Sequence, residues 1–360
     1  MTIKVGIVGV GNCCSSLVQG IRSYRPNEGF MGVMFNDIGG YRVSDIDIVA
    51  AFDVDDGKVG KDLDEAIFAP PNNTIKICDL KRSGVVVSRG FSGDGIGKYS
   101  LIQKKSAVSY VNVAKVLKES GAEIVVNYLP VGSELATKWY VEQALDAGCA
   151  FINAIPVAIA SDSTGGWPNR FKEAGLPVFG DDIKSQLGAT IVHRVLARLF
   201  EERAVVLDRT FQLNYGGNAD FSNMREMERL KTKKISKTGS VQSQLERRLG
   251  SKNIHIGPSD YIEWLDDRKW CDIHMEGRGF AGVPIELDLR LKVWDSPNSA
   301  GCVVDVIRLA KVALDRKVSG SIEVPSAFYF KMPPAYSEQD DFRLKEMLGA
   351  WIADGRNESA

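Results

Sequence analysis

Four lysines fall within eleven residues of this chain, in "LKTKKISKTGS" at 230–240. Lys233 and Lys237 are four residues apart, so on a helix they would share one face. Two neighbouring ammonium groups disfavour each other's charge, which lets one of them titrate closer to neutrality. Such a pair could transfer a proton or hold an anionic group. The alternative is a solvated run of charge, the role that we expect for Lys231 and Lys234.

A glycine-rich loop near the amino terminus indicates a site for a dinucleotide. Gly9 and Gly11 directly follow an apolar run and precede a helical pattern that begins at Asn12. Gly9 permits a tight turn, and Gly11 lets the backbone approach a pyrophosphate at the amino terminus of the helix. Cys14 occupies the third small position, and the cofactor contacts predicted in this loop are Gly9, Gly11, Asn12 and Cys14. The strand–turn–helix context makes this pattern more specific than the glycine spacing alone.

Asp53 ends a second apolar run and is the candidate ligand of the adenosine ribose. A carboxylate there would bond the ribose hydroxyls and repel a 2′-phosphate, which favours NAD over NADP. Asp53 lies 44 residues after Gly9 rather than the usual ~20. We attribute the difference to an insertion over residues 25–45. The alternative role of Asp53 is a helix cap together with Asp55.

Further contacts to the cofactor are expected where later strands end. The stretches "PNNTIK" (71–76) and "GDGIGK" (93–98) offer backbone donors, although simple turns would use the same residue types. In α/β folds, ligands bind beyond the carboxyl ends of the strands. The contacts predicted on this basis are Asn73, Thr74, Gly95, Ile96, Leu129, Pro130, Ala154 and Pro156.

Alternating strands and helices must position these residues. Continuous apolar runs occupy 3–9, 47–53, 121–130, 149–156 and 176–182, and helical patterns begin at Asn12 and cover 133–147. This alternation predicts an α/β fold, a Rossmann-type doubly wound parallel sheet with helices on both faces.

The pattern changes after an amphipathic helix expected over 186–203. Residues 285–295 alternate apolar and charged side chains, which predicts a half-buried antiparallel strand in a second sheet. A helix near 298–316 could return the chain to the first domain, and another is expected over 337–353. We expect an oligomer, because the outer face of the second sheet has to be covered.

Composition excludes several classes of protein. The 360 residues are 44% hydrophobic and carry a net charge of −1, so we expect neither a nucleic-acid nor a membrane partner. No apolar run reaches the about 18–20 residues of a membrane span. The six cysteines include no C-x-x-C pair. We therefore expect a reduced, cytoplasmic protein.

Three further stretches are unusual in combination: "GDDIKSQLGAT" (180–190), "LNYGGNADFSN" (213–223) and "KKISKT" (233–238). With "WDSPNSAG" (294–301) and the glycine loop, they resemble the myo-inositol-1-phosphate synthase family, in particular its shorter bacterial branch. The resemblance extends from residue 3 to about residue 335. It implies an NAD-dependent isomerase, an inositol-3-phosphate synthase that cyclises glucose 6-phosphate while NAD is consumed and regenerated.

The resemblance also implies a domain plan. An NAD-binding Rossmann domain would cover residues 1–184, and an α+β catalytic and oligomerisation domain would cover 185–295. The C-terminal segment 296–360 would return to the first domain, and the assembly would be a homotetramer.

Catalytic roles follow from the same resemblance, position by position. It assigns them to Lys233, Lys237, Lys269, Lys331, Asp182, Asn218, Asp220 and Asp295. Asp182 and Asp295, together with Lys184, would also contact the cofactor. The alternative for Lys269 is a surface ion pair within "DDRKW", and Asp182 could instead cap a helix. After Lys184, "SQLGAT" carries two residues more than longer family members, so the loop should differ locally.

Two other functions share part of this evidence. An ordinary NAD-dependent dehydrogenase of a small phosphorylated substrate would use the same glycine loop but needs only one acid or base. A non-catalytic NAD-sensing protein would need no clustered lysines. A divalent or monovalent cation is compatible with the carboxylates, but His193, His255 and His274 share no ligand spacing and metal ligands are not assigned. We expect a structural role for His193.

Overall fold

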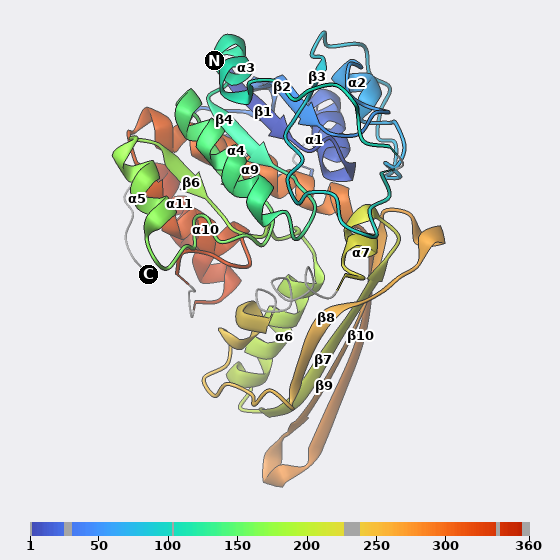
Figure 1. The fold of residues 1–360 in the computed structure, drawn as a ribbon. Helices are drawn as coiled ribbons and strands as arrows, with labels where there is room; N and C mark the ends of the chain where they lie inside the picture. Colours follow the sequence, from blue (N-terminus) through green and yellow to red (C-terminus); the bar gives the residue numbers. More distant parts are fainter. Residues whose placement is uncertain (1, 25–30, 103, 227–237, 336–338, 355–360) are drawn as a thin grey trace.

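In the computed structural model, the chain forms two β-sheets with helices packed on them (Figure 1). The structure describes residues 2–24, 31–102, 104–226, 238–335 and 339–354. Lys233 and Lys237 lie outside the described residues.

The first sheet has seven parallel strands in the order β11-β6-β5-β4-β1-β2-β3. Their bounds are β1 Ile3–Val8, β2 Ile46–Asp53, β3 Val87–Arg89, β4 Ile124–Asn127, β5 Ala150–Asn153, β6 Pro177–Phe179 and β11 Gly320–Ser321. The central strand β1 pairs with both β2 and β4, so the strand order reverses there. This arrangement confirms the predicted doubly wound parallel sheet.

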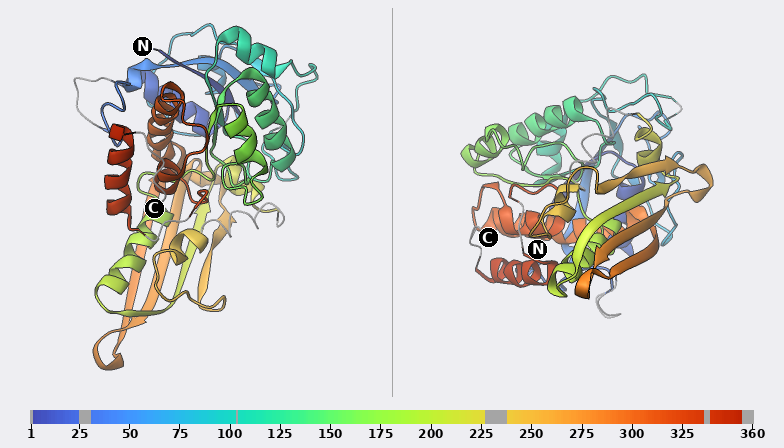
Figure 2. Two further views of the ribbon diagram at one scale, coloured as in Figure 1. Left: turned by 90° about the vertical axis from the view of Figure 1, so that its left-hand side faces the viewer. Right: turned by 90° about the horizontal axis from the view of Figure 1, so that it is seen from below.

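Helices cover both faces of this sheet, because successive side chains of each strand point to opposite sides. Ile3, Val5 and Ile7 belong to one core cluster and Val8 to the other. On the first side lie α1 (Asn12–Ser23), α2 (Leu63–Ala66), α9 (Asp295–Asp315), α10 (Glu323–Tyr329) and α11 (Asp341–Asp354). On the second lie α3 (Val113–Ser120), α4 (Glu134–Ala147) and α5 (Gly166–Glu173), the green helices of Figure 2, left.

The end of the chain returns to the first sheet, as the helical pattern near 298–316 predicted. Helix α9 packs against α1, and Gly320 of β11 then pairs with Pro177 of β6. The last described residues form α11, which starts four residues later than the expected 337. The domain boundaries at 184 and 295 remain a prediction.

The second sheet has four strands in the order β10-β9-β7-β8 and projects away from the first, at the bottom of Figure 1. The strands are β7 (Val206–Gly216), β8 (Ile254–Tyr261), β9 (Arg268–Arg278) and β10 (Pro284–Trp294). Strand β10 is antiparallel to β9, as its alternation predicted, and only half-buried. Helix α6 (Ala189–Glu202) covers one face, and its cluster includes Leu287, Leu289 and Leu291.

Short elements complete the fold. Helix α7 (Ala219–Asn223) follows β7, and 3₁₀ turns lie at η2 (Val43–Asp45), η3 (Glu263–Leu265) and η4 (Phe280–Gly282). Among the described helices, none has the length and apolar character needed to cross a membrane.

Candidate active site

A pocket lies at the carboxyl edge of the parallel sheet, where it meets the second sheet. The glycine loop, the ends of β2, β4 and β5, helix α7, strand β9 and the start of α9 all contribute to its lining. The predicted site residues that line it are Gly9, Gly11, Asn12, Asp53, Gly95, Leu129, Pro130, Ala154, Asp182, Asn218, Asp220, Lys269, Asp295 and Lys331. The structure therefore brings together residues that are up to some three hundred positions apart.

The glycine loop has the geometry that the sequence predicted. Gly9 has a φ of 94°, and a Cβ atom there would lie 2.7 Å from the carbonyl oxygen of Tyr128. Only glycine fits this close approach. At Gly11, which precedes α1, a Cβ atom would meet no protein atom within 4 Å. The space beside Gly11 is thus open for a ligand at the amino terminus of α1.

Asn12 joins the glycine loop to the segment after α2. Its Oδ1 atom accepts from the backbone N–H groups of Asn73 at 2.8 Å and Thr74 at 3.2 Å. Its Nδ2 atom donates to Oδ1 of Asn73 at 2.7 Å. Asn73 and Thr74 therefore lie beside the loop but hold Asn12, and they are not among the residues that line the pocket.

Asp53 holds the same loop from the end of β2. Its carboxylate accepts from the N–H of Val10 at 2.7 Å and from Val54 and Asp55 at 2.6 and 2.9 Å. No helix starts at this point, since α2 begins at Leu63. The helix-cap alternative for Asp53 is therefore wrong, and its carboxylate lies at the pocket.

Two ammonium–carboxylate pairs face the pocket. Lys331 Nζ lies 2.9 Å from Oδ1 of Asp182 and 2.6 Å from the carbonyl oxygen of Ile183. Asp182 caps no helix and has a φ of 61°, in the left-handed region. Lys269 Nζ lies 2.8 Å from Oδ1 of Asp295 at the start of α9. Lys269 is therefore in the pocket, and its partner is not a neighbour within "DDRKW".

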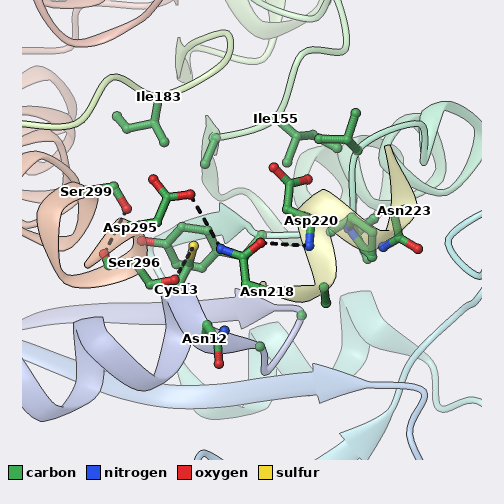
Figure 3. Close-up of a pocket in the computed structure, with 18 of the residues that line it drawn as sticks. Asn12, Cys13, Ile155, Ile183, Asn218, Asp220, Asn223, Asp295, Ser296 and Ser299 are labelled. Atoms are coloured by element: carbon green, nitrogen blue, oxygen red, sulfur yellow. Dashed lines mark hydrogen bonds between the residues drawn. The ribbon is translucent and has the colours of Figure 1, made fainter. Parts of the chain in front are cut away.

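Asn218 connects α7 with the second pair (Figure 3). Its Oδ1 atom accepts from the N–H groups of Asp220 at 3.1 Å and Phe221 at 3.2 Å, which caps α7. Its Nδ2 atom donates to Oδ2 of Asp295 at 3.5 Å. The cap directs Asp220, in the first turn of α7, toward the pocket.

Besides Asn73 and Thr74, four predicted cofactor contacts do not line the pocket: Cys14, Ile96, Pro156 and Lys184. Cys14 is fully buried in the core beneath α1, and burial raises the pKa of its thiol. Lys184 is also buried, and its ammonium donates to the carbonyl oxygens of Ala327 and Phe328 at 2.8 and 3.0 Å. Burial lowers the pKa of Lys184 to about 7. Its position fits a structural role at the end of α10.

Asp267 is the important residue that the sequence analysis missed. It is fully buried and lies behind the pocket, between the glycine loop, Asn218 and the start of α9. Burial, and next the charge of Asp295, raise the pKa of Asp267 to about 6. A signal was present, because Asp267 lies only two residues before Lys269 and directly precedes β9. The charged run "DDRKW" by itself suggests only a surface ion pair.

His193 lies in the protein interior and does not line the pocket. His193 is buried, and its ring nitrogens lie 3.1 Å from Gln212 Oε1 and 2.9 Å from Thr210 Oγ1. It therefore fills the structural role that we expected. Within the described part of the chain, no group of three or more His, Cys, Asp or Glu side chains is arranged to hold a metal ion. The possible cation gains no support from this arrangement.

Fold and site together define a Rossmann-type α/β protein whose pocket is completed by a second sheet. Residues 188–296 match the family model described as myo-inositol-1-phosphate synthase. The inositol-3-phosphate synthase of Mycolicibacterium smegmatis is 55% identical over 352 residues, covering 95% of this chain and 96% of that protein. The chain belongs to the myo-inositol-1-phosphate synthase family.

Two further comparisons agree. The inositol-3-phosphate synthase of Corynebacterium glutamicum is 51% identical, and the match covers 98% of this chain and 99% of the relative. The crystal structure of a myo-inositol-1-phosphate synthase-related protein from Thermotoga maritima superposes with a TM-score of 0.82 at 27% identity. That match covers 98% of this chain and 99% of the other. Both sheets thus lie within the matched region.

Proposed function

We propose that this protein is an inositol-3-phosphate synthase that cyclises glucose 6-phosphate to inositol phosphate with NAD as its cofactor. The observation that carries the proposal is the convergence of two ammonium–carboxylate pairs, Lys269–Asp295 and Lys331–Asp182, on one pocket beside the glycine loop. The family to which the chain belongs supports the same activity.

The residues of the pocket fit a dinucleotide. The open space at Gly11 lies at the amino terminus of α1, where backbone N–H groups and the helix dipole favour a pyrophosphate. Asp53 stands at the end of β2, where a ribose would lie. NAD, when bound, would oxidise carbon 5 of the sugar and return the hydride to the same carbon. Because the cofactor is regenerated, the net reaction is an isomerisation.

The amines supply the charge that this chemistry requires. A ketone at carbon 5 makes carbon 6 acidic, and loss of that proton gives an enolate that attacks the aldehyde at carbon 1. The substrate phosphate, the enolate and the resulting alkoxide are all anionic. A preorganised donor at such an anion typically lowers the activation barrier by ~3–4 kcal/mol. Lys269 and Lys331 are each held in place by a carboxylate, so we assign them this role.

Proton transfer at carbon 6 requires a group that exchanges a proton near neutral pH. The four-residue spacing of Lys233 and Lys237 in the sequence supports the assignment of this proton exchange to one of them. Asp220 and the substrate's own phosphate are further candidates for the base.

The decisive experiment is incubation with glucose 6-phosphate and a catalytic amount of NAD⁺, followed by phosphorus NMR. We expect the cyclised product to accumulate in excess over NAD⁺, with no net rise in absorbance at 340 nm. An NADH signal that grows with substrate consumption would favour an ordinary dehydrogenase instead. Binding of NAD⁺ with no turnover at all would favour the NAD-sensing alternative.

We also propose a cytoplasmic homotetramer in which the second sheet makes contacts between subunits. The tip of its β9–β10 hairpin exposes Phe280 (95%) and Val283 (61%), apolar side chains that a partner subunit would cover. The six free cysteines fit a reducing compartment. Light scattering at micromolar concentration should give four times the 39.4 kDa mass of the chain, and a monomer would contradict the assembly.

A further inference from the structure

Asp267 occupies an unusual position, behind the pocket and outside its lining. It immediately precedes β9, and its side chain is 0% exposed. A buried carboxylate is costly unless hydrogen bonds offset the loss of water. Its surroundings therefore have to supply donors, and they come from both walls of the pocket.

Three side chains donate to Oδ1 of Asp267. Asn12 of the glycine-loop helix donates through Nδ2 at 3.2 Å, and Asn218, the cap of α7, donates through Nδ2 at 3.0 Å. Ser296 in the first turn of α9 donates through Oγ at 2.9 Å, and its N–H reaches Oδ2 at 3.2 Å. The backbone also contributes, because the N–H of Asp295 donates to the carbonyl oxygen of Asp267 at 2.9 Å.

Each of these donors is itself engaged with a part of the site. Asn12 accepts from the N–H groups of Asn73 and Thr74, and so fixes the loop beside the dinucleotide position. Asn218 also reaches Asp295, the partner of Lys269. A continuous chain of hydrogen bonds thus runs from the glycine loop through Asp267 to the ammonium group of Lys269.

The hydrogen bonds at Asp267 require both of its carboxylate oxygens to act as acceptors. An asparagine side chain would have the same shape but would present an NH₂ group to donors on one side. If that group replaced Oδ2 it would face the N–H of Ser296, and if it replaced Oδ1 it would face Asn12 and Asn218. Only a carboxylate accepts from both walls at once.

We propose that Asp267 is a positioning residue that couples the cofactor loop to the Lys269–Asp295 pair, so that cofactor and sugar phosphate strengthen each other's binding. The inference rests on the proposed function, because it assumes a dinucleotide at Gly11 and a sugar phosphate at Lys269. It concerns Asp267 itself, which touches neither ligand.

The test measures that coupling by calorimetry on the full-length chain. NADH and glucitol 6-phosphate cannot react with each other, because this sugar alcohol has no carbonyl group to accept a hydride. In the wild type, we expect glucitol 6-phosphate to tighten NADH binding at least fivefold, within the range typical of coupled sites. In Asp267→Asn the factor should fall below twofold, whereas NADH alone still binds within about threefold of the wild type.

Asp266→Asn is the matched control. Asp266 is the neighbouring aspartate, it is exposed, and it does not line the pocket. It should retain the wild-type coupling factor. Retention of that factor in Asp267→Asn, or its absence from the wild type, would overturn the proposal.

A second variant decides the matter if Asp267→Asn does not fold. Ser296→Ala removes one side-chain donor to Asp267 and leaves its carboxylate in place, so the coupling factor should fall part of the way. An unchanged factor in Ser296→Ala would then count against the proposal. A wild type that binds the two ligands cooperatively but forms no inositol phosphate would refute the proposed function and leave the coupling intact.

Discussion

Lys331 and Asp182 are 149 positions apart in the chain, yet the Lys331 ammonium donates to the Asp182 carboxylate at 2.9 Å. Their backbones are also paired, because the N–H of Lys331 donates to the carbonyl oxygen of Asp182 at 2.8 Å. The end of the chain therefore completes a pocket that the first sheet begins. Asp182 is only 2% exposed, so each partner depends on the other for compensation of its charge.

Removal of the Asp182 charge should impair catalysis more than cofactor binding. Asparagine is the most suitable replacement, because it tolerates the left-handed backbone at this position. In Asp182→Asn the Lys331 ammonium loses its charged partner and keeps neutral acceptors such as the carbonyl oxygen of Ile183. We expect kcat to fall about 10²–10³-fold, as for loss of one preorganised group, with NAD⁺ affinity changed by less than about tenfold.

The control for this variant is an ion pair outside the pocket. Lys311 of α9 and Glu123, which directly precedes β4, lie 2.7 Å apart, and neither residue lines the pocket. Glu123→Gln should leave kcat within about twofold of the wild type. Equal losses in the two variants would mean that the Asp182 effect is a general loss of stability.

Lys269 and Asp295 should behave as a unit. We expect Lys269→Met and Asp295→Asn each to lower kcat/KM by about 10²–10³-fold. The double variant should be little worse than the more damaged single variant, because residues in direct contact couple strongly. A double-mutant cycle of kcat/KM values measures this coupling. Fully additive losses would show that the two residues act independently.

The parallel sheet could be predicted from the sequence because its strands are buried on both faces. The segments 124–126 and 149–152 are then apolar throughout, and Gly9 and Gly11 follow β1 at the spacing of a strand–turn–helix connection. The half-buried strand β10 was equally clear from its alternation. These patterns do not give the distances between elements. The convergence of Lys269, Asp295 and Lys331 could therefore be predicted only from the resemblance to the family.

Lys184 and Asp267 show why the local sequence does not reveal the surroundings of a charged side chain. Lys184 lies two residues after the last aspartate of the G-D-D motif, and this proximity in the sequence suggested a shared role. Its ammonium is instead held by the carbonyl oxygens at the end of α10. Those carbonyls belong to a segment more than 140 residues away. Asp267 was missed because burial of a charged side chain depends on donors from three distant elements, and local charge patterns suggest solvent instead.

The lysine run 231–237 allows a prediction with its own controls. Lys233→Ala and Lys237→Ala should each remove most turnover, about 10²-fold or more, while NAD⁺ still binds. Lys231→Ala and Lys234→Ala should retain kcat within about threefold, since we expect solvated positions for them. Phosphorus NMR gives the turnover, and calorimetry gives the NAD⁺ affinity. Parallel loss of NAD⁺ binding would show that the two lysines serve the cofactor rather than the sugar.

His193 gives a prediction about stability and pH. Burial lowers the pKa of its imidazole to about 4, compared with an ordinary value of 6.5. The unfolded chain therefore binds a proton between these values that the folded protein does not. The contribution of the neutral, buried His193 to the free energy of unfolding is fully present above pH 6.5 and is lost as the pH falls toward 4.

The size of this effect follows from the same two pKa values. At 1.36 kcal/mol per pKa unit, the loss between pH 7 and pH 4 amounts to about 3 kcal/mol. His193→Gln removes the titrating ring, so its free energy of unfolding should decline less steeply over this interval than that of the wild type. Denaturant unfolding at half-unit steps of pH measures both curves. The ring is hydrogen-bonded only to neutral partners, Gln212 and Thr210. If the curves of the wild type and His193→Gln ran parallel, the folded protein would take up the imidazole proton as readily as the unfolded chain, which would contradict the prediction.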